Sequence, residues 1–135
     1  MSKNHPIQIH PRYLALFFVV LGVEICIALF FQDNFVRPYG GDVLAVVWVY
    51  AGIRSIRKTA PRRGAAIAFS IACLVELGQL VHIADRMGLA EGSAWRILLG
   101  TGFDGCDFLA YLAGALLIVA VEALVARRRA LAKSK

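Results

Sequence analysis

Acidic residues stand inside or beside long apolar runs of this sequence, where a charge is costly. Asp42 opens one apolar run and Glu76 lies within another. Asp104 and Asp107 open a third. Carboxyl groups at such positions can accept hydrogen bonds from hydroxyls and amines, bind cations or transfer protons. A group of them would therefore suit either a polar ligand or metal-assisted chemistry.

Helical spacing relates Glu76 to other polar residues. Residues three or four apart lie on one face of an α-helix. Glu76, Gln79 and His82 follow one another at intervals of three, and Arg86 comes four residues later. The spacing predicts that all four share one broad face.

Asp104, Asp107 and Tyr111 form a second row, at intervals of three and four. Both rows and Asp42 are expected at one level of a membrane, where they would line a polar cleft with arginines as partners. The residues expected to bind a ligand are Arg37, Asp42, Glu76, Gln79, His82, Arg86, Arg96, Asp104, Asp107 and Tyr111.

The same acids allow other interpretations. They could form a purely structural network of ion pairs. They also include enough acids, bases and potential ligands for an intramembrane metal-assisted hydrolase or transferase. The sequence has no His-Glu-x-x-His pattern and no nucleophile elbow. We therefore assign no catalytic residue and no metal ligand, the residues specify no cofactor, and a binding protein is favoured over an enzyme.

Four apolar runs must carry these residues. Of the 135 residues, 59% are hydrophobic and 18% are charged, which is more apolar than soluble domains are. The fold class predicted is all-α: a polytopic membrane protein with four transmembrane helices bundled in a single domain over residues 1–135. The predicted spans are 13–31, 39–56, 64–83 and 104–125.

Span length predicts the depth of the acids. A bilayer core about 30 Å thick needs about 20 helical residues, and only residues 43–53 of the second run are free of charge. Asp42 is therefore expected within the outer half of the membrane, at the level of Glu76. Glu24 is expected near mid-membrane, hydrogen-bonded across helices, and Glu122 near the inner end, reaching toward the basic tail.

The loop between the third and fourth spans contains a further helical signal. Ser93 can cap a short helix over residues 94–99, which Gly100 would end. Trp95 would give this helix an apolar side. We expect a short interfacial helix that lies at the membrane surface or folds back as a lid.

Basic residues set the expected orientation. Five lie in the last turn of the second span or between it and the third, and five follow the fourth, whereas the first and third loops hold one and two. Positively charged loops stay in the cytoplasm. The prediction is a multi-pass protein of the bacterial inner membrane with both termini cytoplasmic. The net charge of +6 lies in clusters beside apolar runs, which argues against nucleic-acid binding.

Three motifs resemble those of known bacterial membrane proteins. They are Arg-Pro-Tyr-Gly-Gly-Asp over 37–42, Glu-Leu-Gly-Gln over 76–79, and Phe-Asp-x-x-Asp-x-x-Ala-Tyr-x-x-Gly over 103–114. Together they are similar to the family called domain of unknown function 2809, over nearly the whole chain. This resemblance implies a membrane architecture and no established activity.

Glu-x-x-Gln on one span and Asp-x-x-Asp on the next resemble, more distantly, the VanZ-like proteins. Some of these are associated with tolerance of the antibiotic teicoplanin, which implies a role in the cell envelope. Two features depart from their pattern. Tyr111 stands where those proteins tend to have Asn, and Arg96 lies further from Asp104 than their arginine does.

The function expected is therefore binding of a lipid, or of a lipid-linked envelope precursor, by its head group in the outer cleft. Arginines would meet phosphate, and carboxylates would meet hydroxyls, amines or a bridging cation. Membrane lipids are the expected partners. A small transporter subunit is an alternative that would need a homo-oligomer, because four helices enclose little volume.

Overall fold

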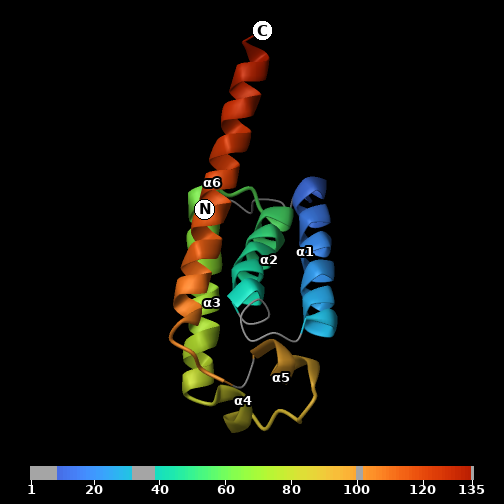
Figure 1. Cartoon of the computed structure of the whole chain (residues 1–135), viewed down its shortest axis with the longest axis vertical. Coiled ribbons are helices and arrows are strands. Elements are labelled where there is room, and N and C mark those ends of the chain that lie inside the picture. Colours follow the sequence, from blue (N-terminus) through green and yellow to red (C-terminus); the bar gives the residue numbers. More distant parts are fainter. Residues whose placement is uncertain (1–8, 32–38, 100–101, 135) are drawn as a thin grey trace, which may run out of the picture.

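The computed structural model describes residues 9–31, 39–99 and 102–134, and within these ranges every regular element is a helix. Four long helices lie roughly side by side, and two short ones cross one end (Figure 1). The helices are α1 Pro11–Phe30, α2 Gly41–Ile56, α3 Pro61–Leu80, α4 Ile83–Arg86, α5 Ala94–Leu99 and α6 Asp107–Lys133.

Local sequence explains where several helices begin and end. Pro11 and Pro61 stand at the first positions of α1 and α3, where proline loses no hydrogen bond and its fixed φ suits a helix. The α3 helix ends at Leu80, and His82 then adopts a left-handed conformation with φ 53°. Because of this break, His82 and Arg86 do not continue the face of Glu76 that the spacing predicted.

Helix α2 lies at the centre of the molecule. It packs against α1 on one side and against both α3 and α6 on the other, and α3 and α6 also pack on each other. The buried core comprises Val46, Tyr50, Ala65, Ala68, Ala72, Tyr111 and Ile118. Small residues on α3 let the helices approach closely, as is common in membrane bundles.

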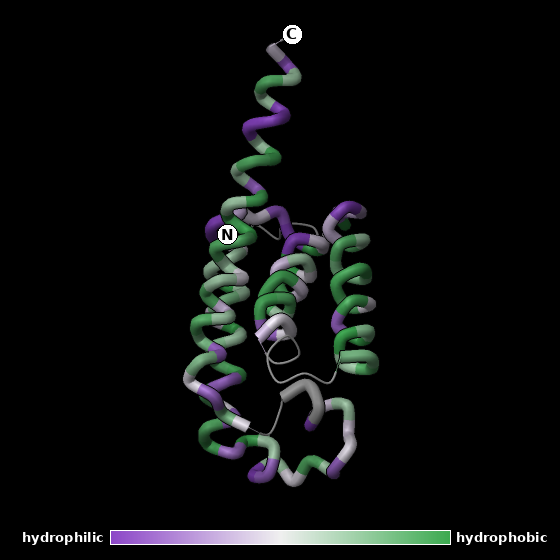
Figure 2. The backbone as a smooth tube through the Cα atoms, viewed as in Figure 1, coloured by the Kyte–Doolittle hydropathy of each residue, from purple (hydrophilic) through white to green (hydrophobic). Residues whose placement is uncertain are grey.

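Three of the helices, α1, α3 and α6, are long and apolar enough to cross a membrane. Many of their large apolar side chains are exposed on the outside of the bundle, and green segments dominate these helices in Figure 2. A soluble protein rarely exposes apolar surface on this scale. The prediction of an all-helical membrane protein is confirmed at this level.

The fourth of the long helices, α2, is short, as the sequence predicted. Its 16 residues give about 24 Å at 1.5 Å per residue. By contrast, α6 has 27 residues, continues past the predicted end at residue 125, and projects beyond the other helices (Figure 1). Its last two turns are rich in arginine, lysine and alanine, which favour helix without requiring burial.

The short helix predicted over residues 94–99 is present as α5. The Ser93 hydroxyl accepts a hydrogen bond from the backbone N–H of Arg96 at 3.3 Å, so Ser93 acts as its N-terminal cap. Trp95 on this helix is 68% exposed.

Candidate functional site

Glu76 is a fully buried carboxyl group, with 0% of its surface exposed. Its Oε1 accepts a hydrogen bond from the backbone N–H of Asp104 at 2.9 Å. Its Oε2 accepts one from the Tyr111 hydroxyl at 3.0 Å. Both carboxyl oxygens are thus satisfied, which offsets the cost of burying them. Glu76 therefore fastens α3 to the beginning of α6.

Asp42 and Asp107 form a second contact at the same end. The two side chains lie close enough between α2 and α6 for each carboxyl group to influence the ionisation of the other. Two carboxyl groups this close repel one another when both are ionised, so their protonation is linked. Asp42 also interacts electrostatically with Glu76. The pair is therefore a place where one proton can be held between two acids.

Asp104 lies at the exposed edge of this group. Its side chain accepts a hydrogen bond from the backbone N–H of Cys106 at 2.9 Å, just before α6 begins. Asp104 also interacts electrostatically with Asp107. We call Asp42, Glu76, Asp104 and Asp107, with the Tyr111 hydroxyl, the acidic cluster. It runs from the buried Glu76 to the exposed Asp104.

Glu24 brings a further carboxyl near the acidic cluster from α1. It interacts electrostatically with Asp42. Its buried Oε1 has no hydrogen-bond partner among the described residues. The hydrogen bond across helices that the sequence suggested for Glu24 is therefore not present at this oxygen in the described part of the chain.

The basic residues expected beside the acids are placed differently. Arg96 makes an ion pair with Asp85 at 2.6 Å and donates a hydrogen bond to the Leu89 carbonyl at 3.1 Å. Arg86 is exposed on α4 and forms no ion pair with a described residue. Arg37 lies outside the described residues. The described arginines therefore do not neutralise the acidic cluster.

Two other predicted residues also remain outside the hydrogen-bond network. Gln79 is half-buried on α3, and His82 is exposed at the break after it. Neither side chain hydrogen-bonds to another described residue. Across the described ranges, no group of three or more His, Cys, Asp or Glu side chains is arranged to hold a metal ion.

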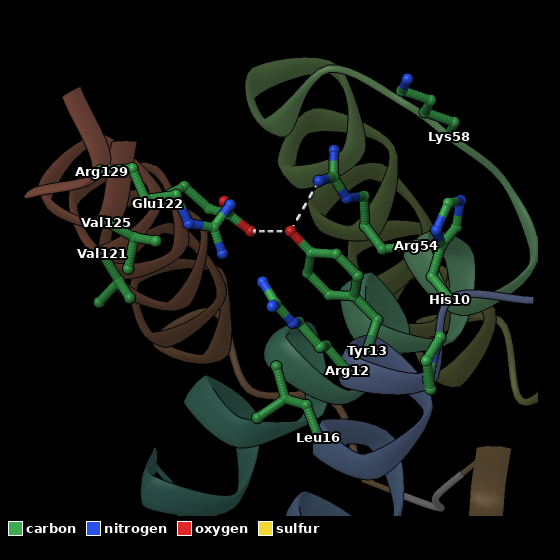
Figure 3. Close-up of a pocket in the computed structure, with 11 residues that line it drawn as sticks. His10, Arg12, Tyr13, Leu16, Arg54, Lys58, Val121, Glu122, Val125 and Arg129 are labelled. Carbon is green, nitrogen blue, oxygen red and sulfur yellow. Dashed lines mark hydrogen bonds between the residues drawn. The ribbon is translucent and has the colours of Figure 1, made fainter. Parts of the chain in front are cut away.

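The opposite end of the bundle holds a network that the sequence analysis missed. The hydroxyls of Tyr13 and Tyr50 both donate to Oε1 of Glu122, each at 2.7 Å. Arg54 donates to the Tyr13 hydroxyl at 2.6 Å, and its guanidinium lies 4.5 Å from the centre of the Tyr13 ring. Glu122 therefore bonds to tyrosines of α1 and α2 rather than to the basic tail, and Figure 3 shows the bond to Tyr13 of α1. The available signal was Tyr50 and Arg54 four residues apart at the end of an apolar run.

Comparison with known proteins gives the family and nothing further. No curated protein and no solved structure matches this chain. The model of a family described as "Protein of unknown function (DUF2809)" matches residues 31–115. The match includes every member of the acidic cluster but neither Tyr13 nor Glu122. Because it covers more than half of the 135 residues, the chain belongs to the DUF2809 family.

Proposed function

We propose that the protein crosses the inner membrane of a bacterium four times, with α1, α2, α3 and α6 as spans and both termini in the cytoplasm. Arg12 lies in the first turn of α1, Arg54 in the last turn of α2, and Arg62 and Arg63 in the first turn of α3. The basic part of α6 extends from the same end of the bundle (Figure 2). Such an accumulation of positive charge at one end supports a cytoplasmic location for that end. The acidic cluster would then lie toward the outside.

At the acidic cluster, we infer binding of the polar head group of a membrane lipid or of a lipid-linked envelope precursor. One observation carries this inference. Carboxyl groups from α2, α3 and α6 meet at one end of the bundle, and no described lysine or arginine forms an ion pair with them. Ionisable groups within membrane bundles commonly mark ligand or ion pathways.

The negative charge of the acidic cluster limits the classes of ligand that it can bind. A group of acids without cationic partners favours a ligand that supplies positive charge or hydrogen-bond donors. An amine-bearing head group does both. A phosphate held by Arg96 is less well supported, because that arginine is engaged with Asp85. The more distant likeness to VanZ-like proteins is compatible with an envelope ligand.

The short helix α5 fits the same proposal. Trp95 is 68% exposed on it, and tryptophan favours the interface between membrane and water. We propose that α5 lies in this interface beside the acidic cluster, where it would meet the head groups of the outer leaflet.

Asp107→Asn tests the head-group proposal. Asparagine preserves the size of the side chain and can still hydrogen-bond to Asp42, but it removes one of the two ionisable carboxyl groups. The full chain in mild detergent is titrated with phosphatidylethanolamine, and bound lipid is counted by native mass spectrometry. We expect the affinity to fall about tenfold, as loss of a charge-assisted hydrogen bond would cause.

Glu91→Gln is the matched control, because Glu91 is an exposed acid in the loop at the same end. Its affinity for phosphatidylethanolamine should equal that of the unaltered chain. If Asp107→Asn binds this lipid as tightly as the control does, the acidic cluster is not a site for amine-bearing head groups.

A proton-coupled transporter subunit is the second candidate. The proximity of Asp42 and Asp107 favours it, because two carboxyl groups whose protonation is linked can hold and release a proton. Such a role would require a homo-oligomer. Proton movement across liposomes would favour this function over head-group binding.

A further inference from the structure

A cavity of about 630 Å³ lies at the opposite end of the bundle from the acidic cluster. It lies between the beginning of α1 and the later turns of α6, and Arg54 at the end of α2 also lines it (Figure 3). The hydrogen bond between Tyr13 and Glu122 crosses it. We call this cavity the α1–α6 groove.

Positive charge surrounds the α1–α6 groove. Its lining includes Arg12, Arg54, Lys58 and Arg129, against one acid, Glu122. That acid already accepts two tyrosine hydroxyls. Arg12, Lys58 and Arg129 form no ion pair with any residue that the structure describes. Several cations that converge on one space without partners favour an anionic ligand.

The rest of the lining is apolar. Leu16 of α1 and Val121 and Val125 of α6 contribute to the same groove. A smaller cavity of about 160 Å³ shares Leu16, Val121 and Glu122 with it and extends along Val47, Leu117 and Ile118. A charged entrance therefore leads into an apolar furrow between two helices that are each able to cross a membrane.

We propose that the α1–α6 groove is a binding site for one anionic phospholipid. The phosphate lies among Arg12, Arg54 and Arg129, and an acyl chain follows the furrow past Leu16 and Val121. A soluble phosphate would use only the charged entrance, whereas a lipid matches both parts. This site is independent of the acidic cluster, because it lies at the other end and has the opposite charge.

The test compares two double variants that remove the same charge. Arg12→Gln with Arg129→Gln alters the groove, and Arg127→Gln with Arg128→Gln alters exposed arginines of α6 that do not line it. Each protein in mild detergent is titrated with phosphatidylglycerol and phosphatidylcholine, with bound lipid counted by native mass spectrometry. The unaltered chain should prefer phosphatidylglycerol by about tenfold. Only the groove variant should lose this preference.

A second pair of variants tests the furrow. Leu16→Trp fills its apolar part, whereas Val19→Trp adds the same side chain at an exposed position of α1 outside both cavities. Phosphatidylglycerol binding should fall with Leu16→Trp and remain unchanged with Val19→Trp. In both tests Asp107→Asn should bind phosphatidylglycerol normally, which separates this proposal from the proposed function.

Three results would overturn the proposal. Equal loss in both arginine pairs would indicate diffuse attraction to a basic surface. Displacement of phosphatidylglycerol by millimolar glycerol 3-phosphate would indicate a site for soluble anions. Equal binding of phosphatidylglycerol and phosphatidylcholine by the unaltered chain would show that the groove does not select anionic lipid.

Discussion

Glu76 and Glu122, at opposite ends of the bundle, are both carboxyl groups that need hydrogen-bond donors in apolar surroundings. Each is a carboxyl group on a largely apolar helix, and each accepts hydrogen bonds from tyrosine hydroxyls. A tyrosine places most of its ring in apolar surroundings while its hydroxyl reaches a polar partner. At Glu76 the tyrosine hydroxyl and a backbone N–H satisfy the carboxyl group, whereas at Glu122 Arg54 also bonds to one of the two tyrosine hydroxyls.

The Tyr111 hydroxyl should contribute to the free energy of unfolding only while the Glu76 carboxyl group accepts its hydrogen bond. Tyr111→Phe removes one of the two hydrogen bonds to a fully buried carboxyl group. We expect a loss of about 1 kcal/mol in the free energy of unfolding, typical of hydrogen bonds within membrane bundles. Equilibrium unfolding in mixed micelles measures this loss.

Glu76→Gln provides the background that isolates this bond. In that background Tyr111→Phe should cost less free energy of unfolding, since the carboxyl acceptor has already been replaced, giving a coupling energy of at least about 0.5 kcal/mol. Strictly additive losses would mean that the hydroxyl and the carboxyl group do not stabilise one another.

Close approach of α2 and α6 depends on a small residue. A Cβ atom built at Gly114 would lie 2.7 Å from the Val43 carbonyl oxygen and 3.1 Å from the Val46 Cβ. Backbone atoms cannot move aside as a flexible side chain can, so α6 would have to shift. This approach also brings Asp107, two turns earlier on α6, toward Asp42.

Gly114→Ala should therefore destabilise the protein by about 1–3 kcal/mol, the usual cost of overpacking a core. It should also weaken lipid binding at the acidic cluster. Gly22→Ala in α1 is the matched control, because a Cβ there has nothing within 4 Å. That variant should be neutral or more stable by up to about 1 kcal/mol, owing to the higher helix propensity of alanine. Equal stability of the two variants in mixed micelles would contradict the proposed close approach.

Charge is divided between the two ends of the whole molecule. The acidic cluster lies where α2 and α6 begin, and the basic residues lie where α1 and α3 begin and where α6 extends. A helix that begins at one end and continues to the other should place these ends on opposite sides of a membrane. The two proposed sites would then face different leaflets and select head groups of different charge.

Cysteine labelling tests this arrangement, including the crossing of α2. In a background without native cysteines, Glu91→Cys should react with a membrane-impermeant maleimide applied from outside the cell. Thr59→Cys, between α2 and α3, and Ser134→Cys, after α6, should react only after permeabilisation. Labelling of Thr59→Cys from outside would mean that α2 does not cross, and that three spans with a different orientation are present.

The sequence by itself predicts the helices well, because apolar runs and end signals are local. Proline at the beginning of α1 and α3 and Ser93 before α5 act within one turn of helix. The apolar length of α1, α3 and α6 likewise indicates membrane crossing without knowledge of any neighbour. Prediction from local signals fails at His82, whose left-handed conformation ends the helical face that the spacing alone would have continued.

The same distinction between local signals and long-range contacts applies to the candidate site. That Asp42, Glu76 and Asp107 lie at one end follows from their positions on antiparallel helices, and this could be predicted from the sequence. The partner of each charge could not. Arg96 pairs with Asp85, and Tyr13 bonds to a glutamate 109 residues away. Four similarly apolar helices do not specify their own arrangement, so only the tertiary structure decides which polar groups meet across them and where the α1–α6 groove opens.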